Sequence, residues 1–121
     1  MKRDMDLVRK ILLAIEESED PFFSSSLQID GYTDKEIGYH VRIMVDGGLV
    51  DAKDSSTFQG EDFLIHGLTW QGHEFLDAAR NDTVWNEVKN NLKGQFYTLP
   101  FAVVKDLLVA YIKTKYLTGN N

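Results

Sequence analysis

Two segments in the first half of the chain place apolar residues at the three- and four-residue spacing of an amphipathic helix. The first predicts a helix from about Asp4 to Glu19, which ends before Pro21 because proline disfavours helical backbone in the preceding residue. The second predicts a helix that begins at Thr33, where Thr33-Asp-Lys-Glu36 forms a capping box, and that stops at Gly47-Gly48. The apolar positions are Leu7, Val8, Ile11, Leu12 and Ile15, then Ile37, Val41, Met44 and Val45.

Shorter patterns between and after these helices indicate strands and turns. Residues 27–29 alternate as a half-buried strand does, after a loop at residues 24–26. Residues 49–53 and 63–69 predict a β-hairpin with a long polar tip from 54 to 62. No separate helix is predicted between residues 21 and 31, because that stretch is short and rich in turn residues.

The second half of the chain is predicted to be helical. Thr69 caps a helix that carries Phe75, and the apolar spacing then continues through Trp85 on a stripe rotated by roughly 80°. We therefore predict a break at Asn81-Asp82 with Asp82 as N-cap, the alternative being one long curved helix. Residues 94–99 indicate a linker, and Pro100 suits the first turn of a last helix that extends to about residue 117.

The last predicted helix is apolar on nearly every side in its first half. A helix of this kind is buried on more than one side. In so small a domain, we expect part of that burial to come from a second chain. The candidate dimer residues are Phe101, Val104, Leu108, Tyr111 and Ile112.

Length and composition limit the remaining possibilities. At 121 residues the chain fits one domain, which we divide into a core at 1–80, a helical extension at 81–117 packed on the core or on a dimer partner, and a disordered tail at 118–121. Cysteine is absent, which excludes disulfides and suits a cytoplasmic location. The N-terminus has no signal-peptide pattern, and no apolar run approaches the ~20 residues that span a bilayer, so no membrane contact is expected.

Short motifs at the ends of these predicted elements resemble those of known families. Val45-Asp-Gly-Gly-Leu-Val50, the hairpin, and Leu68-Thr-Trp-Gln-Gly72 resemble the recognition helix, the wing and the helix that follows it in a winged-helix domain. The resemblance implies an α+β fold with additional C-terminal helices. Residues 1–12, Ile37-Gly-Tyr-His40, residues 68–77 and residues 79–83 are also similar to the domain-of-unknown-function family 2513, whose members occur in bacterial genomes, phages and prophages. That resemblance supplies no catalytic residue.

A winged helix would present Lys35, Tyr39 and Arg42 on its second long helix, with Lys53 at the wing, to DNA or to another partner. The formal net charge of −6 opposes DNA binding, because affinity for DNA comes largely from basic groups that neutralise phosphates. Carboxylates also share this helix and the hairpin. A solvated helix face is the alternative interpretation.

Catalytic and metal motifs are weak. His73-Glu-Phe-Leu-Asp77 is similar to the zinc-protease pattern but lacks its second histidine. His40 and His66 are expected to be structural or partly exposed, and Trp70 and Trp85 to be packing anchors. We therefore predict no catalytic, cofactor or metal site, and a non-enzymatic binding module of phage or mobile-element origin that acts through a protein partner or as a homodimer. The alternative is a DNA-binding transcriptional regulator.

Overall fold

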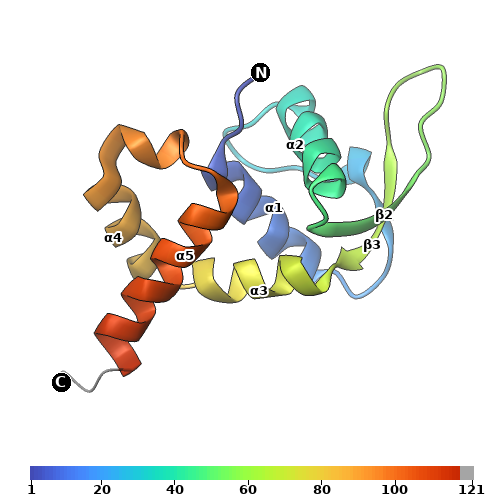
Figure 1. The fold of residues 1–121 in the computed structure, drawn as a ribbon. Coiled ribbons are helices and arrows are strands. Elements are labelled where there is room, and N and C mark those ends of the chain that lie inside the picture. The colour runs from blue at the N-terminus through green and yellow to red at the C-terminus, as the bar shows by residue number, and fades with distance from the viewer. Residues whose placement is uncertain (118–121) are drawn as a thin grey trace. The chain divides into compact units, whose positions relative to one another are not determined.

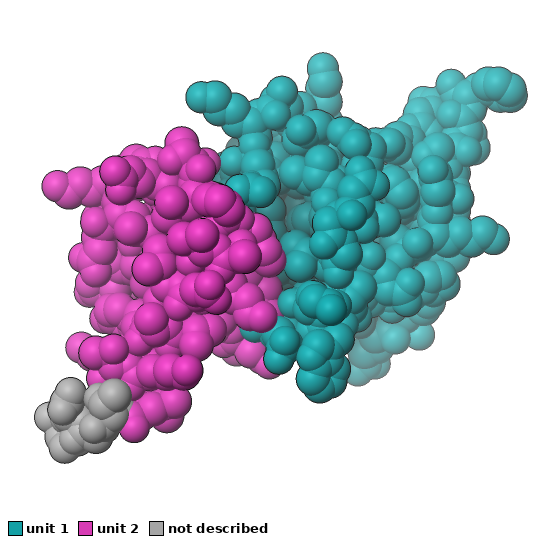
Figure 2. Space-filling view, in the orientation of Figure 1, with its two compact units in different colours: residues 1–74 teal, residues 75–121 magenta. Residues whose placement is uncertain are grey.

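The chain folds as an α+β protein, with five α-helices and one three-stranded antiparallel sheet in residues 1–117, the part that the computed structural model describes (Figure 1). The expected tail at 118–121 lies outside the described residues. The chain divides into two compact units, unit 1 at residues 1–74 and unit 2 at residues 75–121 (Figure 2). The division that we predicted, between residues 80 and 81, stays a prediction.

Unit 1 builds its core from α1, α2 and the sheet. Helix α1 packs against α2 and against β3, and β3 is the central strand in the order β1-β3-β2. The core side chains come from one stripe of each helix and from the inner face of the sheet, as the apolar spacing predicts. The elements are α1 (Met5–Glu17), β1 (Phe22–Phe23), a 3-10 turn (Ser24–Ser26), α2 (Asp34–Asp46), β2 (Val50–Asp54) and β3 (Phe63–Leu68).

Side-chain caps fix where both long helices of unit 1 begin. The Asp4 carboxylate accepts hydrogen bonds from the backbone N–H groups of Asp6 and Leu7, at 2.9 and 3.2 Å. The capping box at α2 is confirmed: Thr33 accepts from the Glu36 N–H, and the Glu36 carboxylate accepts from the Thr33 N–H. Each cap satisfies backbone donors that a helix leaves unpaired at its first turn.

The two motifs that carried the winged-helix resemblance lie in contact with each other. The Thr69 hydroxyl donates to the Gly48 carbonyl at 2.6 Å and accepts from the Gly72 N–H at 3.0 Å, while the Thr69 N–H donates to the Leu49 carbonyl at 3.0 Å. A Cβ at Gly72 would collide with that Leu49 carbonyl, so the close approach requires glycine. Gly48 adopts a left-handed φ of +79° at the point where the chain leaves α2.

The predicted strand at residues 27–29 is wrong. The strand is Phe22–Phe23, which pairs with Ile65 and Leu64 of β3. The apolar alternation at 27–29 buries Leu27 without any strand partner, because β3 passes beside the earlier residues. The stretch at 24–26 is a 3-10 turn and not an irregular loop, and no α-helix lies between α1 and α2, as expected.

Unit 2 contains the rest of α3 and two further α-helices. Helix α3 (Trp70–Ala79) begins in unit 1 and ends in unit 2; α4 (Asp82–Leu92), a 3-10 helix (Lys93–Tyr97), α5 (Phe101–Ile112) and a π-helical turn (Lys113–Leu117) follow. The predicted break between α3 and α4 is confirmed, but its N-cap is Asn81 and not Asp82, because the Asn81 side chain reaches the Val84 N–H. The predicted linker at 94–99 is largely the 3-10 helix.

Aromatic rings form the centre of unit 2. Trp85 meets Phe96 edge to face, with ring centroids 5.1 Å apart, and meets Phe75 in the same way at 6.3 Å. Phe75 stacks on Phe101 at 4.2 Å. Trp85 is the expected packing anchor, but the same prediction for Trp70 is wrong, because that side chain is 75% exposed. Trp70 precedes Gly72 by two residues, roughly 200° around the helix, so it points away from the Gly72–Leu49 contact.

Candidate functional site

The outer face of α2 is occupied by an interaction network around Arg42. The guanidinium lies over the Tyr39 ring at 5.2 Å from its centroid, 3.3 Å from the Asp46 carboxylate and 3.6 Å from that of Glu61. Sequence reasoning grouped Tyr39 and Arg42, and the structure brings them together. It also adds Glu61, which lies beyond β2 and could not be placed there from its position in the sequence. The two carboxylates compensate the charge that Arg42 would offer to a phosphate.

The other two candidate contact residues are exposed lysines. Lys35 lies in the first turn of α2, beside Asp34 and Glu36. Lys53 lies on β2 opposite Leu64, on the face of the sheet that carries the half-exposed Phe23. The carboxylates around Lys35 and Arg42 leave the α2 face with little net positive charge.

A structured loop joins β2 to β3 and extends beyond the sheet (Figure 1). We call residues 55–62 the hairpin loop. Thr57 and Gly60 pair through two backbone hydrogen bonds of 2.9 and 3.1 Å, which close a tight turn around residues 58 and 59. The side chain at the outer end of this turn is Phe58, which is fully exposed. The composition of the loop is polar throughout except at this position, and that lone aromatic was the signal that sequence reasoning missed.

Asp62 ties the base of the hairpin loop to the 3-10 turn. Its carboxylate accepts from the Ser24 hydroxyl at 2.9 Å, from the Ser25 hydroxyl at 2.9 Å and from the Ser25 N–H at 3.0 Å. Burial alone would raise the pKa of Asp62, but these hydrogen bonds and one from the Phe63 N–H outweigh burial and hold the pKa below its usual value. The serines therefore anchor the loop and are not arranged as nucleophiles beside a base.

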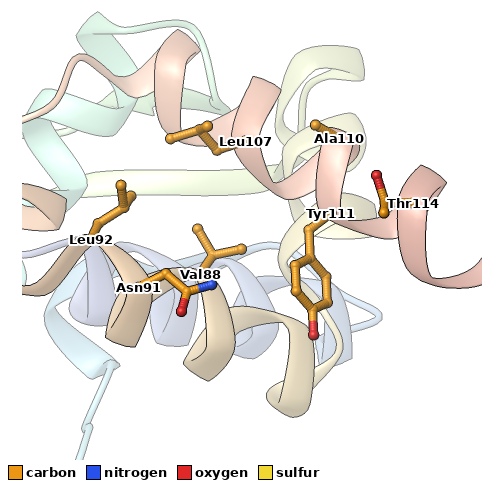
Figure 3. A pocket seen from close by; sticks show the side chains of 7 residues that line it. All are labelled: Val88, Asn91, Leu92, Leu107, Ala110, Tyr111 and Thr114. Carbon is orange, nitrogen blue, oxygen red and sulfur yellow. The ribbon is translucent and has the colours of Figure 1, made fainter.

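An apolar groove lies between α4 and α5, within unit 2 (Figure 3). Its volume is about 270 Å³. Tyr111 and Leu107 enter it from α5, and Val88 and Leu92 face them from α4. Within the described chain, Val104 and Leu108 of the predicted dimer set are fully buried, whereas Tyr111 remains half-buried at the groove. Leu107 and Tyr111 therefore leave part of the apolar surface of α5 accessible in the groove. Phe101 stacks on Phe75, and Ile112 is half-buried.

The two units differ in charge. Unit 1 contains seven Lys or Arg and fifteen Asp or Glu, a net charge of −8, whereas residues 75–117 contain six and four, a net charge of +2. Part of the acidic excess lies in the hairpin: residues 50–62 carry four carboxylates and one lysine. Hydrogen bonds from the Ser56 side chain and backbone lower the pKa of Asp54, so it is ionised at neutral pH.

The histidines do not form a metal centre. His40 is buried between two backbone groups: its Nε2 accepts from the Asp4 N–H at 2.8 Å, and its Nδ1 donates to the Glu36 carbonyl at 2.8 Å. His66 and His73 are both exposed. Within residues 1–117, no three His, Cys, Asp or Glu side chains come close enough together to hold a metal ion.

These features describe a small α+β protein with an apolar groove in one unit and a projecting acidic loop in the other. Residues 2–96 match the family described as hypothetical protein DUF2513, and the chain belongs to that family. A protein of Haemophilus influenzae described as uncharacterised is 40% identical over 110 residues, which cover 88% of this chain and 92% of that protein. No solved structure matches the chain. Among the described residues, no helix has the length and apolar content that crossing a bilayer requires.

Proposed function

We propose that this protein is a non-enzymatic interaction module that binds another protein, in the first instance a second copy of itself, through α5. The observation that carries the proposal is the open α4–α5 groove, because a monomer gains nothing from leaving Leu107 and Tyr111 accessible to water. Apolar burial drives most protein association, and aromatic side chains such as Tyr111 are enriched at interfaces.

A dilution series in the analytical ultracentrifuge tests this proposal. Leu107→Glu places a charge in the groove, and we expect it to shift the protein to monomer at concentrations where the unchanged chain associates. Ala102→Glu is the matched control, since Ala102 is exposed on the same helix but does not line the groove. A protein that sediments as a monomer at every concentration contradicts self-association. Equal effects of the two substitutions contradict a role for the groove.

We further propose a winged-helix arrangement for unit 1. The order of helix, strand, helix, hairpin and helix, together with the sheet order β1-β3-β2, supports it. The 3-10 turn at Ser24–Ser26 stands where such a domain has its second helix.

We also propose that the gene for this protein originates from a phage or another mobile element. The genes that neighbour it on the chromosome test that origin, and a neighbourhood without integrase, capsid or lysogeny genes would oppose it.

The second candidate is DNA binding, which the winged-helix order of elements favours and the charge pattern opposes. Arg42 already contacts two carboxylates, and Lys35 lies between two more. Fluorescence anisotropy with a labelled duplex at low salt decides between the candidates. DNA binding predicts affinity that falls steeply with added salt and weakens in Arg42→Ala. No binding at low salt removes this candidate.

A further inference from the structure

We infer that the hairpin loop of one copy inserts Phe58 into the α4–α5 groove of a second copy. This inference rests on the proposed self-association and goes further, since it names both surfaces of the contact. The partner is therefore this chain itself, and the contact joins unit 1 of one molecule to unit 2 of another. Three observations carry the inference: the presentation of Phe58, the dimensions of the groove, and the charges around the two surfaces.

The hairpin loop presents Phe58 as a preformed anchor. The Thr57–Gly60 pair closes the turn, and the Gln59 N–H donates to the Thr57 hydroxyl at 3.2 Å. Below the turn, the Ser55 N–H donates to the Asp62 carbonyl at 2.9 Å, and the serines of the 3-10 turn hold the Asp62 carboxylate. A backbone that is already ordered loses little conformational entropy on binding. More of the free energy gained by burying the exposed ring therefore contributes to affinity.

The groove has the size and the lining that a phenyl ring requires. A cavity of about 150 Å³ lined by aliphatic and aromatic side chains accommodates benzene. The α4–α5 groove has a volume of about 270 Å³, and Val88, Leu92, Leu107 and Tyr111 give it apolar walls. The groove is open to solvent, so a side chain from another molecule can enter it. Figure 3 shows the side chains that line it. Aromatic anchors that fill such pockets dominate the energy of many interfaces.

The charges around the two surfaces are opposite. Residues 50–62, which include the loop, carry a net charge of −3. Residues 82–117, which contain α4, α5 and the short helical turns that follow each of them, carry five lysines against Asp82, Glu87 and Asp106, a net charge of +2. Opposite potentials guide two surfaces into register and disfavour other pairings. The same charges disfavour contact of two hairpin loops with each other, or of two grooves.

The contact joins two different surfaces of the chain. Each copy carries one hairpin loop and one groove, so two copies can form a closed dimer in which each loop enters the groove of the other, and more copies can form a larger ring or an open chain. An isologous dimer through α5 would instead use the groove of both partners and leave the hairpin loop unoccupied. An experiment that identifies which two surfaces meet therefore distinguishes this inference from self-association through α5 alone.

The test mixes two variants that are each defective on one surface only. Phe58→Ala keeps the groove, and Leu107→Glu keeps the hairpin loop. We expect each variant alone to self-associate about 30-fold more weakly than the unchanged chain, as for loss of an interface anchor. An equimolar mixture should form a one-to-one heterodimer, because one intact loop then meets one intact groove. Circular dichroism verifies that both variants are folded, and Gln59→Ala is the matched control at the neighbouring exposed position.

The outcomes separate this inference from the proposed function. Recovery of association in the mixture, together with an association that weakens as salt is added, supports insertion of the loop into the groove. Association of Phe58→Ala at the strength of the unchanged chain, with loss only in Leu107→Glu, overturns the inference and leaves an isologous α5 interface. A monomer in every sample, the unchanged chain included, overturns the inference together with the proposed self-association.

Discussion

Unit 1 and unit 2 each bury an apolar core, but they differ in the contacts that join their elements. In unit 1, side chains hold the backbone by hydrogen bonds at nearly every junction, as Asp4, Thr33, Asp62 and Thr69 show. In unit 2, the centre consists of aromatic rings whose centroids lie 4.2–6.3 Å apart. Helix α5 leaves part of its apolar surface in an open groove. Directional bonds therefore fix the junctions of unit 1 in addition to its apolar core, whereas contacts between rings dominate the centre of unit 2.

The difference indicates which changes each unit tolerates. Each hydrogen bond contributes about 1 kcal/mol to the free energy of unfolding, but leaving a buried polar group without its partner lowers that free energy by more. A large ring in a core contributes several kcal/mol through burial and dispersion, and its loss leaves a cavity. We therefore expect the largest effects of single substitutions among the rings of unit 2, and smaller, more local effects among the polar junctions of unit 1.

The largest effect is expected at Phe96, which is fully buried against Trp85. Phe96→Ala should lower the free energy of unfolding by about 4 kcal/mol, because it removes the ring and leaves a cavity. The fluorescence of Trp85 during denaturation with urea measures this effect. Trp70→Phe makes Trp85 the single tryptophan of the chain, and the 75% exposure of Trp70 makes that background substitution mild.

Val103→Ala is the control for this prediction, since its side chain on α5 is 39% exposed. It should change the free energy of unfolding by well under half as much. A Phe96→Ala protein that unfolds at the same urea concentration as its parent would contradict this account of the two units, because the rings would then not determine the stability of unit 2.

A close approach of backbone to backbone in unit 1 gives the next largest effect. Gly72→Ala should destabilise the protein by about 3 kcal/mol, because the new Cβ would meet the Leu49 carbonyl and force α3 away from it. Gly38→Ala is the matched control inside α2, where a Cβ meets open space. We expect that change to stabilise α2 by about 0.5–1 kcal/mol. Thermal unfolding of both variants measures the contrast, and equal shifts would contradict the role of the Gly72 contact.

Features of unit 1 that are encoded within a few residues were predicted, whereas those that depend on a distant part of the chain were not. The capping box at Thr33 and the stop at Gly47-Gly48 are encoded within a few residues, so both could be found without knowing the fold. The strand at Phe22–Phe23 could not, because its partner β3 lies some forty residues later, and the local alternation at 27–29 was the stronger pattern.

The interaction surfaces were predicted only in part. The apolar last helix was correctly recognised, but which of its sides remains open depends on how α4 packs against it, and that places Leu107 in the groove and Val104 in the core. The contact of Arg42 with Glu61 depends on the path of the hairpin. Phe58 was overlooked because a single aromatic in a polar tip has no periodicity to detect.

The buried histidine of unit 1 is expected to give an intermediate effect. His40→Leu keeps the size of the side chain but removes the acceptor for the Asp4 N–H, which should destabilise the protein by about 2 kcal/mol. His66→Leu is the control on the exposed side of β3, where we expect a change within about 0.5 kcal/mol. Urea denaturation at neutral pH measures both. Equal stabilities of the two variants would show that the Asp4–His40 hydrogen bond contributes nothing to unit 1.

The smallest effect concerns Tyr32, whose hydroxyl donates to the Asp4 carboxylate at 3.2 Å. Tyr32→Phe should cost about 1 kcal/mol at neutral pH, the value of one hydrogen bond. Burial first, and then the negative charge of Asp4 and this hydrogen bond, raise the pKa of Tyr32 from 10.0 to about 12. The folded state therefore holds the phenolic proton more tightly than the unfolded chain does, and the contribution is complete below pH 10 and is lost as pH rises toward 12.

Stability measured from pH 8 to 12 tests this linkage and, with it, the polar character of unit 1. The unchanged chain should lose stability relative to Tyr32→Phe above pH 10, because its unfolded state then releases the Tyr32 proton while the folded state still holds it beside Asp4. Tyr116→Phe is the control, since Tyr116 is 54% exposed, and its curve should run parallel to that of the unchanged chain. If the Tyr32→Phe curve is also parallel, the Tyr32–Asp4 hydrogen bond does not hold the start of α1, and the Asp4 carboxylate acts there only as a cap for the N–H groups of Asp6 and Leu7.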